Sequence, residues 1–242
     1  MLAIYKRELS GFFSSLIAYL SISVFLIVLS LFLWVFTESS VLEFGFASLD
    51  VMFDTVPVLF MFLIPAITMK SFAEERSSGT LEIIFTKPLN DLEIILGKFF
   101  ANATLVICAL IPTLIYYASI YILGSPVGNI DSGGVMGSYF GLVMLGLAFT
   151  SIGILSSTLT TNQITAFILG VFLCFFLYLG LDSVSRLSVF FGSLDHLIQQ
   201  LGMLSHYKSM SRGVIDTRDL IYFLSVIIFF IYLSKVVIQR LK

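Results

Sequence analysis

The chain has 242 residues, of which 58% are hydrophobic and only 12% are charged, with a formal net charge of −2. An ordinary soluble domain carries about 25% charged residues, so this composition leaves too little polar surface to face water and argues against a soluble enzyme or a disordered chain. The absence of a basic excess also argues against nucleic acid as a partner. We expect a single all-α integral membrane domain over residues 1–242.

The first segment, residues 1–15, is predicted to form an amphipathic helix. Apolar side chains recur at helical spacing from Leu2 onward, and Lys6, Arg7 and Glu8 occupy the opposite face. This pattern suits a helix that lies in the membrane interface before the chain turns into the bilayer. A membrane-surface anchor with no other task is the alternative.

Six apolar runs are predicted to cross the membrane as helices, because a hydrocarbon core of about 30 Å requires roughly 20 helical residues. They cover residues 16–36, 56–69, 99–123, 137–157, 164–181 and 220–234. The second run is short, and we expect its helix to begin nearer Val51. Pro57 and Pro65 within it kink a membrane helix without forbidding it. Six spans place both termini on the same side.

Basic residues predict which side is cytoplasmic. The N-terminal tail, the loop after the second span and the C-terminal end hold two, four and three of the 13 Lys and Arg residues, and the first two loops on the opposite side hold none. The positive-inside rule therefore places both termini in the cytoplasm. The last outer loop, residues 182–219, also carries basic residues, which we assign to structure lying on the membrane.

Residues 70–98 are predicted to form a helix–turn–helix elbow in the cytoplasm. Residues 77–79, Ser-Ser-Gly, break the helix that leaves the second span, and residues 80–85 form a short helix that a proline then ends. Asn90 and Glu93 have the spacing of a capping box for the helix that enters the third span. A plain connection is the alternative, but the loop is longer than a turn requires and densely charged, which favours a docking surface.

The outer loop contains a second amphipathic segment. Apolar residues recur at helical spacing from Leu187 to Leu204, and Gly192-Ser193 is expected to divide them into two short helices at the outer interface. A surface anchor is again the alternative.

Catalytic and cofactor motifs are absent from the sequence. There is no P-loop, no H-E-x-x-H and no paired C-x-x-C, so we expect no catalytic residue, cofactor site or metal site in this chain. His196 and His206 both fall in the outer loop, with Asp195 beside His196, and we interpret them as surface histidines. Ionisable residues are missing from the middle of the spans, which argues against an ion-coupled carrier and indicates that any transport is driven by a partner.

The polar side chains within the predicted spans include Asn102, Thr113, Tyr116 and Thr150. They could line a permeation path, and hydrogen bonds between helices explain them equally well.

The stretch from Leu63 to Glu82, LIPAITMKSFAEERSSGTLE, resembles the signature of ABC-2-type transporter permeases. In that family a Glu-Glu-Arg and a Gly-Thr-Leu-Glu run follow the second of six spans. Residues 86–89, TKPL, and 94–98, IILGK, also match. Within the family the chain looks most similar to the smaller permease subunit of the gliding-motility ABC transporter of Bacteroidetes.

The resemblance implies that the loop after the second span is a coupling helix seated in a groove of a separate cytoplasmic ATPase, which binds the ATP and Mg. The contact would be lined or shaped by Glu74, Glu75, Arg76, Gly79, Thr80, Leu81 and Glu82. The N-terminal helix would be an elbow, and the outer loop would close the periplasmic end of a path between two permease chains. In the gliding system the second permease would be larger, with a periplasmic domain, and the assembly would lie in the bacterial inner membrane.

The leading hypothesis is therefore a non-catalytic permease subunit of an ATP-driven transporter. A membrane scaffold that transmits ATPase motion to periplasmic partners without moving a solute would have the same coupling loop, and substrate flux separates the two. An enzyme that uses Asp195, His196 and His206 is a third hypothesis. We also expect a proline or glycine at Leu92 or Ile94 to uncouple ATP hydrolysis from transport, because the helix entering the third span must be rigid.

Overall fold

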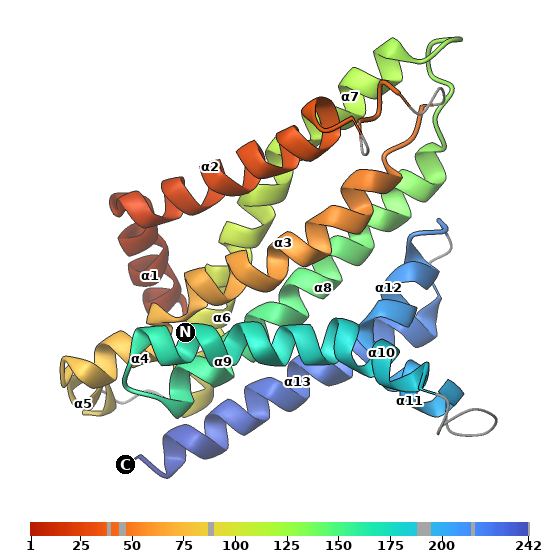
Figure 1. Cartoon of the computed structure of the whole chain (residues 1–242). Helices are drawn as coiled ribbons and strands as arrows, with labels where there is room; N and C mark the ends of the chain where they lie inside the picture. The colour runs from red at the N-terminus through yellow and green to blue at the C-terminus, as the bar shows by residue number, and fades with distance from the viewer. Residues whose placement is uncertain (38–39, 44–46, 87–89, 188–194, 214–215, 242) are drawn as a thin grey trace.

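The computed structural model describes residues 1–37, 40–43, 47–86, 90–187, 195–213 and 216–241, and this described part of the chain is helical, without β-strands. In chain order the elements are α1 (Leu2–Ser14), α2 (Leu16–Ser30), η1 (Leu31–Val35), α3 (Asp50–Thr68), α4 (Lys70–Ser77), α5 (Thr80–Phe85), α6 (Asp91–Leu110), η2 (Ile111–Thr113), α7 (Leu114–Leu123), α8 (Ser132–Leu159), α9 (Gln163–Phe175), η3 (Phe176–Gly180), α10 (Leu181–Ser185), α11 (Asp195–Leu201), α12 (Met203–Met210) and α13 (Thr217–Gln239) (Figure 1).

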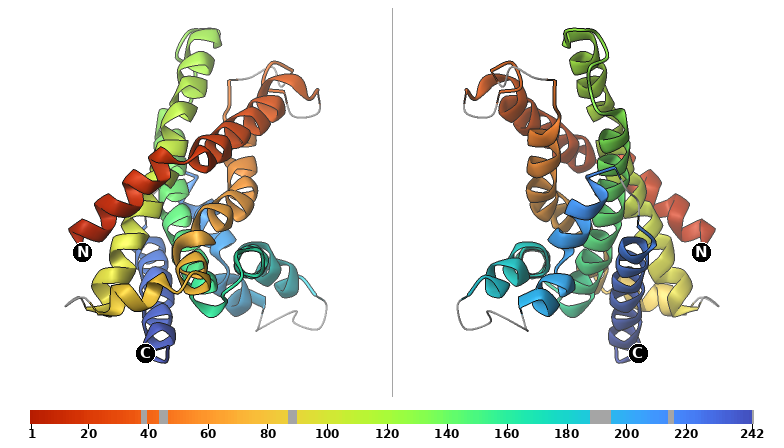
Figure 2. Two further views of the ribbon diagram at one scale, coloured as in Figure 1. Left: turned by 90° about the vertical axis from the view of Figure 1, so that its left-hand side faces the viewer. Right: turned by 90° about the vertical axis from the view of Figure 1, so that its right-hand side faces the viewer.

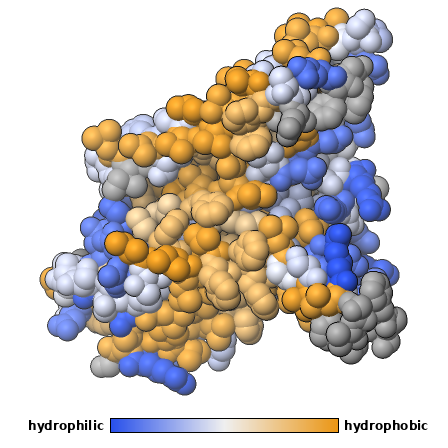
Figure 3. All heavy atoms as spheres, in the orientation of Figure 1, coloured by the Kyte–Doolittle hydropathy of each residue, from blue (hydrophilic) through white to orange (hydrophobic). Residues whose placement is uncertain are grey.

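The six predicted spans are confirmed. In the described part of the chain, six helical segments are long and apolar enough to cross a membrane: Ala18–Val35, Asp50–Ser77, Asp91–Leu123, Ser132–Leu159, Gln163–Ser185 and Thr217–Gln239. The second begins at Asp50, close to the expected Val51, and α3 stays helical through both of its prolines. The space-filling view shows an apolar band with hydrophilic residues at both ends (Figure 3). Both termini and the α4–α5 segment lie at the same end of the bundle (Figures 1 and 2).

The long helix α8 forms the centre of the bundle. It packs against α3, α4, α6, α9, α12 and α13, and Figure 2 shows α6 and α9 on opposite sides of it. Glycines permit the close approach: a Cβ atom on Gly146 would lie 2.7 Å from Val106 Cγ1 of α6, and one on Gly153 would overlap Thr68 of α3.

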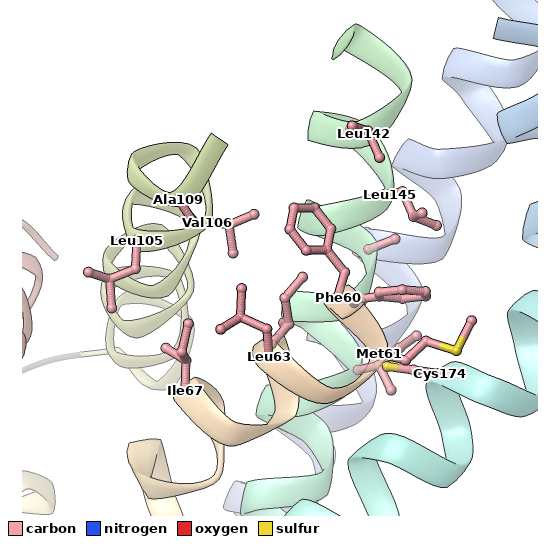
Figure 4. Close-up of a cluster of buried hydrophobic side chains, with 14 of the residues drawn as sticks. Phe60, Met61, Leu63, Ile67, Leu105, Val106, Ala109, Leu142, Leu145 and Cys174 are labelled. Carbon is pink, nitrogen blue, oxygen red and sulfur yellow. The ribbon is translucent and has the colours of Figure 1, made fainter. Parts of the chain in front are cut away.

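Apolar side chains from α3, α6, α8 and α9 meet in the centre of the bundle. Figure 4 shows Phe60, Met61, Leu63 and Ile67 of α3 close to Leu105, Val106 and Ala109 of α6, Leu142 and Leu145 of α8, and Cys174 of α9. Each of these side chains is buried. Because lipid is as apolar as the core, close packing rather than removal from water holds these helices together.

The helix predicted at the N-terminus is present as α1. Ser15 is extended and separates it from α2. α1 also packs on α6, where a Cβ atom on Gly97 would lie 3.0 Å from Ile4 Cβ, and Tyr5 Oη lies 3.1 Å from Thr104 Oγ1. The helix is therefore docked on the bundle rather than free on the membrane surface.

The outer loop differs from the prediction in two respects. Helix α10 prolongs the fifth span to Ser185, and the sixth begins at Thr217, so the connection is shorter than residues 182–219. The apolar stripe is broken at Gly202, which is extended and separates α11 from α12. The break expected at Gly192-Ser193 lies outside the described residues.

Helix α12 is not a surface anchor. Met203, Tyr207 and Met210 are buried, and Tyr207 Oη donates a hydrogen bond to the carbonyl oxygen of Phe53 at 2.7 Å. The amphipathic pattern is the same for a helix that turns its apolar face to lipid and for one that turns it to the bundle, so the sequence could not separate these two environments.

Candidate functional site

The candidate site is the segment from α4 to the start of α6, which connects the second and third spans. Between α3 and α4, at Met69, the side chain of Ser157 from α8 inserts into the helix. Ser157 Oγ accepts hydrogen bonds from the amides of Phe72 and Ala73 at 2.9 and 3.1 Å and donates one to the carbonyl of Met69 at 3.0 Å. The inserted hydroxyl satisfies backbone groups at the junction and fastens α4 to the end of α8.

The predicted turn between α4 and α5 is confirmed. The Ser77 and Ser78 hydroxyls donate to the carbonyl of Glu74 at 2.9 and 2.8 Å, and Gly79 has a φ of +71°. Only glycine adopts this left-handed conformation without steric cost, which explains its place at the corner. Helix α5 then runs over the predicted residues, with Glu82 in its first turn.

Helix α6, which follows the elbow, begins at a capping box, as predicted. Glu93 Oε2 accepts a hydrogen bond from the Asn90 amide at 3.2 Å, and the Asn90 side chain pairs with the backbone three residues on. Helix α6 starts at Asp91 and continues into the third span. Lys87, Pro88 and Leu89, including the proline expected to end α5, lie outside the described residues.

Two residues of the Glu-Glu-Arg run face the bundle. Arg76 Nη1 donates a hydrogen bond to the carbonyl of Thr158 at the end of α8. The Glu75 carboxylate is only 14% exposed, and its Oε1 lies 2.9 Å from Lys98 Nζ of α6 and also contacts Arg7 of α1. Contacts within the chain therefore occupy both charged groups.

Glu75 belongs to a ring of four alternating charges. Glu8 Oε1 lies 2.7 Å from Arg7 Nη2 and 3.0 Å from Lys98 Nζ, and Glu75 Oε1 contacts the same two cations. Lys98 is 1% exposed, and its ammonium lies 5.0 Å from the centre of the Phe72 ring. Burial alone would raise the pKa of Glu8, but Lys98 and Arg7 outweigh it and hold that pKa below its usual value. We call Arg7, Glu8, Glu75 and Lys98 the charge ring.

The remaining candidate residues divide by exposure. Glu74, Gly79, Thr80 and Glu82 are exposed, whereas Leu81 is buried. The sequence analysis missed Ile83, whose side chain is 61% exposed beside Glu82, while Ile84 turns inward. A signal was present, because a six-residue helix with four apolar side chains, Thr80–Phe85, cannot bury all of them against one surface.

The outer-loop histidines do not form a shared catalytic site. His206 Nδ1 lies 2.7 Å from Asp219 Oδ1 and Nε2 lies 2.8 Å from the Gln200 carbonyl, so neither ring nitrogen is free for a substrate. His196 pairs instead with the Gln200 side chain at 3.0 Å. Asp195 accepts a hydrogen bond from the amide of His196. His206 therefore has no free ring nitrogen with which to act as a general base.

Three of the four polar side chains considered as a permeation path bond between helices. Asn102 Nδ2 donates to Ser71 Oγ at 3.0 Å, Thr113 Oγ1 lies 3.2 Å from Tyr139 Oη, Tyr116 Oη lies 2.6 Å from Ser30 Oγ, and Thr150 Oγ1 donates to the Gly146 carbonyl of its own helix at 2.7 Å. These contacts favour packing over a permeation path for the four residues.

Comparison with known proteins indicates the same family as the Glu-Glu-Arg motif. Residues 37–237 match the family model described as ABC-2 family transporter protein. The chain is also 32% identical over 125 residues to proteins described as probable multidrug ABC transporter permease YbhR, from Escherichia coli strain K12 and from Escherichia coli O157:H7. Each match covers 52% of this chain and spans 30% of the length of the relative.

Proposed function

Because the chain belongs to the ABC-2 family of transporter proteins, we propose that it is a transmembrane permease subunit that couples ATP hydrolysis in a separate cytoplasmic ATPase to transport. The observation that carries the proposal is the α4–α5 elbow. It presents an exposed apolar side chain, Ile83, at the end of the bundle that holds both termini.

The elbow is built to transmit force. On one side of α5, helix α4 is fastened to α8 through Ser157. On the other side, helix α6 continues from a capped start at Asp91 into the third span. An ATPase that changes shape can move the spans only through an element that is rigid and continuous with them. Helices α4 and α6, which flank α5, meet both conditions.

The surface of the elbow also indicates the chemistry of the partner. Ile83 projects beside Glu82, and Glu74 is exposed at the end of α4. A groove that accepts this surface needs an apolar pocket with basic groups at its rim. In this proposal Glu74, Thr80, Leu81 and Glu82 shape the contact together with Ile83, while Glu75, Arg76 and Gly79 hold the elbow in position. ATP and Mg are bound by the ATPase.

A second permease chain completes the proposed assembly. In the most apolar stretches of the first, fifth and sixth spans, only 22%, 22% and 28% of the residues are buried, respectively. Large apolar faces therefore remain for lipid or for another permease. We propose the bacterial inner membrane as the location, with both termini and the elbow in the cytoplasm and α11–α12 on the periplasmic side.

The gliding-motility assignment, with a larger second permease that carries a periplasmic domain, stays a prediction from the sequence resemblance. The curated relatives are named for multidrug transport. Membership in a transporter family favours transport over the scaffold hypothesis. Flux of a solute in reconstituted vesicles is the measurement that separates these two.

Co-purification tests the proposal. The chain is extracted gently from its native membrane, and mass spectrometry identifies the proteins that accompany it. We expect a P-loop ATPase to co-purify with the wild type and to be lost with Ile83→Asp. The control is Val127→Asp, in the loop between α7 and α8, where Val127 is 69% exposed; this variant should keep the ATPase. Equal recovery of the ATPase with Ile83→Asp would contradict docking at α5, and recovery without any ATPase under conditions that preserve membrane complexes would contradict the function.

A further inference from the structure

The charge ring connects three elements that the chain keeps apart. Arg7 and Glu8 belong to α1, Glu75 to α4 and Lys98 to α6. Each carboxylate contacts both cations through one oxygen, so the ring is closed and neutral. Removal of a single member would leave a charge without its partner in a largely buried place.

Three kinds of contact hold α1 on α6: packing of Ile4 against Gly97, a hydrogen bond between Tyr5 and Thr104, and the Glu8–Lys98 ion pair of the ring. The connection from α1 to α4 runs instead through the Arg7 and Lys98 side chains on Glu75. Buried ion pairs add little net stability over apolar replacements, but they fix which groups meet and in what geometry.

We propose that Arg7, Glu8, Glu75 and Lys98 are positioning residues that make α1 move together with the α4–α5 elbow. The second acid of the Glu-Glu-Arg run then serves to recruit the N-terminal helix rather than to touch the ATPase. The inference rests on the proposed function, and it adds α1 to the elements that the ATPase displaces. Because α1 leads through Ser15 into α2, its displacement would carry the movement into the first span.

Spin-label distances test the inference. Labels are attached to cysteines placed at the exposed Ser10 of α1 and Ser77 of α4, in a chain whose two native cysteines are replaced, and the protein is measured in lipid nanodiscs. We expect one narrow distance for the wild type, with the permease alone and with its co-purifying ATPase and a non-hydrolysable ATP analogue. Lys6→Gln, an exposed cation on α1 outside the ring, serves as the control and keeps the narrow distance. Glu8→Gln loses it.

A neutral double variant covers the case in which single variants misfold. Lys98→Met with Glu75→Leu removes one charge of each sign, which leaves Arg7 paired with Glu8 and no uncompensated charge. It should fold and lose the narrow α1–α4 distance. A narrow distance in this variant, or a wild-type α1–α4 distance that changes when the ATP analogue binds, would overturn the inference. Failure of the ATPase to co-purify with the wild type would instead count against the proposed function, and the permease-alone measurement would still report on the ring.

Discussion

Gly153 shows how a single atom limits the packing of the central helix. A methyl group there would overlap Thr68 of α3. We predict that Gly153→Ala lowers the free energy of unfolding by about 1 to 3 kcal/mol, the usual cost of overpacking, measured as a lower melting temperature in detergent. Gly11→Ala is the control, because nothing lies within 4 Å of the added atom, and alanine favours a helix by up to about 1 kcal/mol. Equal melting temperatures for the two variants would refute the overlap.

Glu8 makes the charge ring sensitive to acid. Because its pKa is lowered in the folded chain, its contribution to stability is complete above the usual glutamate pKa of about 4.3 and is lost as the pH falls through the lowered value. We predict that the α1–α4 spin-label distance is unchanged between pH 8 and pH 5 and broadens only at pH values below the usual one. Broadening near neutral pH would show that another group controls the ring.

The sequence predicted the turn and the helix ends of the elbow better than it predicted which contacts the charged residues make. The Glu-Glu-Arg motif identified Glu75, but its partners Lys98 and Arg7 are distant in sequence and become neighbours only when α1 and α6 pack together. The positive-inside rule uses Lys98 only as a charge near the membrane, so it cannot show that this lysine is buried. Ile83 has no charge and no motif, and its exposure follows from the direction in which α5 turns Leu81 and Ile84.

At the scale of elements, proline substitutions at two positions in the first turn of α6 test whether this helix must be rigid. Leu92 is the second residue of the helix, where an amide has no helical acceptor and proline is tolerated. Ile94 is buried, and its amide donates to the Asn90 carbonyl at 3.2 Å. We therefore revise the expectation for Leu92: Leu92→Pro should leave ATPase-driven transport nearly intact, and Ile94→Pro should lower it severely while both proteins still insert.

ATP-driven transport in reconstituted vesicles, measured together with membrane insertion, checks this difference between the two proline variants. Equal loss of transport in both would mean that the first turn of α6 tolerates no change of backbone. Normal transport with Ile94→Pro would count against α6 as a rigid arm.

The elements themselves were largely predictable because each depends on local chemistry. Hydrophobic length gave the six spans, Gly79 gave the corner, and Asn90 with Glu93 gave the start of α6. The separation of α11 from α12 at Gly202 was not predicted, because the apolar spacing continues across it. The burial of α12 depends on Tyr207 reaching Phe53 of α3, a contact that no local pattern contains.

At the scale of the whole molecule, the orientation in the membrane has a direct test. Helix α5, which carries Ile83, and the loop after α7, which carries Val127, lie at opposite ends of the described bundle (Figure 1), and both residues are largely exposed. We predict that a membrane-impermeant maleimide labels Val127→Cys in intact cells and labels Ile83→Cys only after permeabilisation, in a chain without Cys108 and Cys174. The reverse pattern would place the elbow outside the cell and remove the basis for its contact with an ATPase.

The most direct test of the central claim is a photo-crosslinking amino acid placed at Ile83 in native membranes, with the same group at Val127 as the control. The proposed function predicts that illumination attaches a P-loop ATPase to position 83 and not to position 127, because α5 is the surface that the ATPase holds. Adducts at position 83 with lipid alone, in membranes from which the ATPase co-purifies with the permease, would contradict docking through this helix.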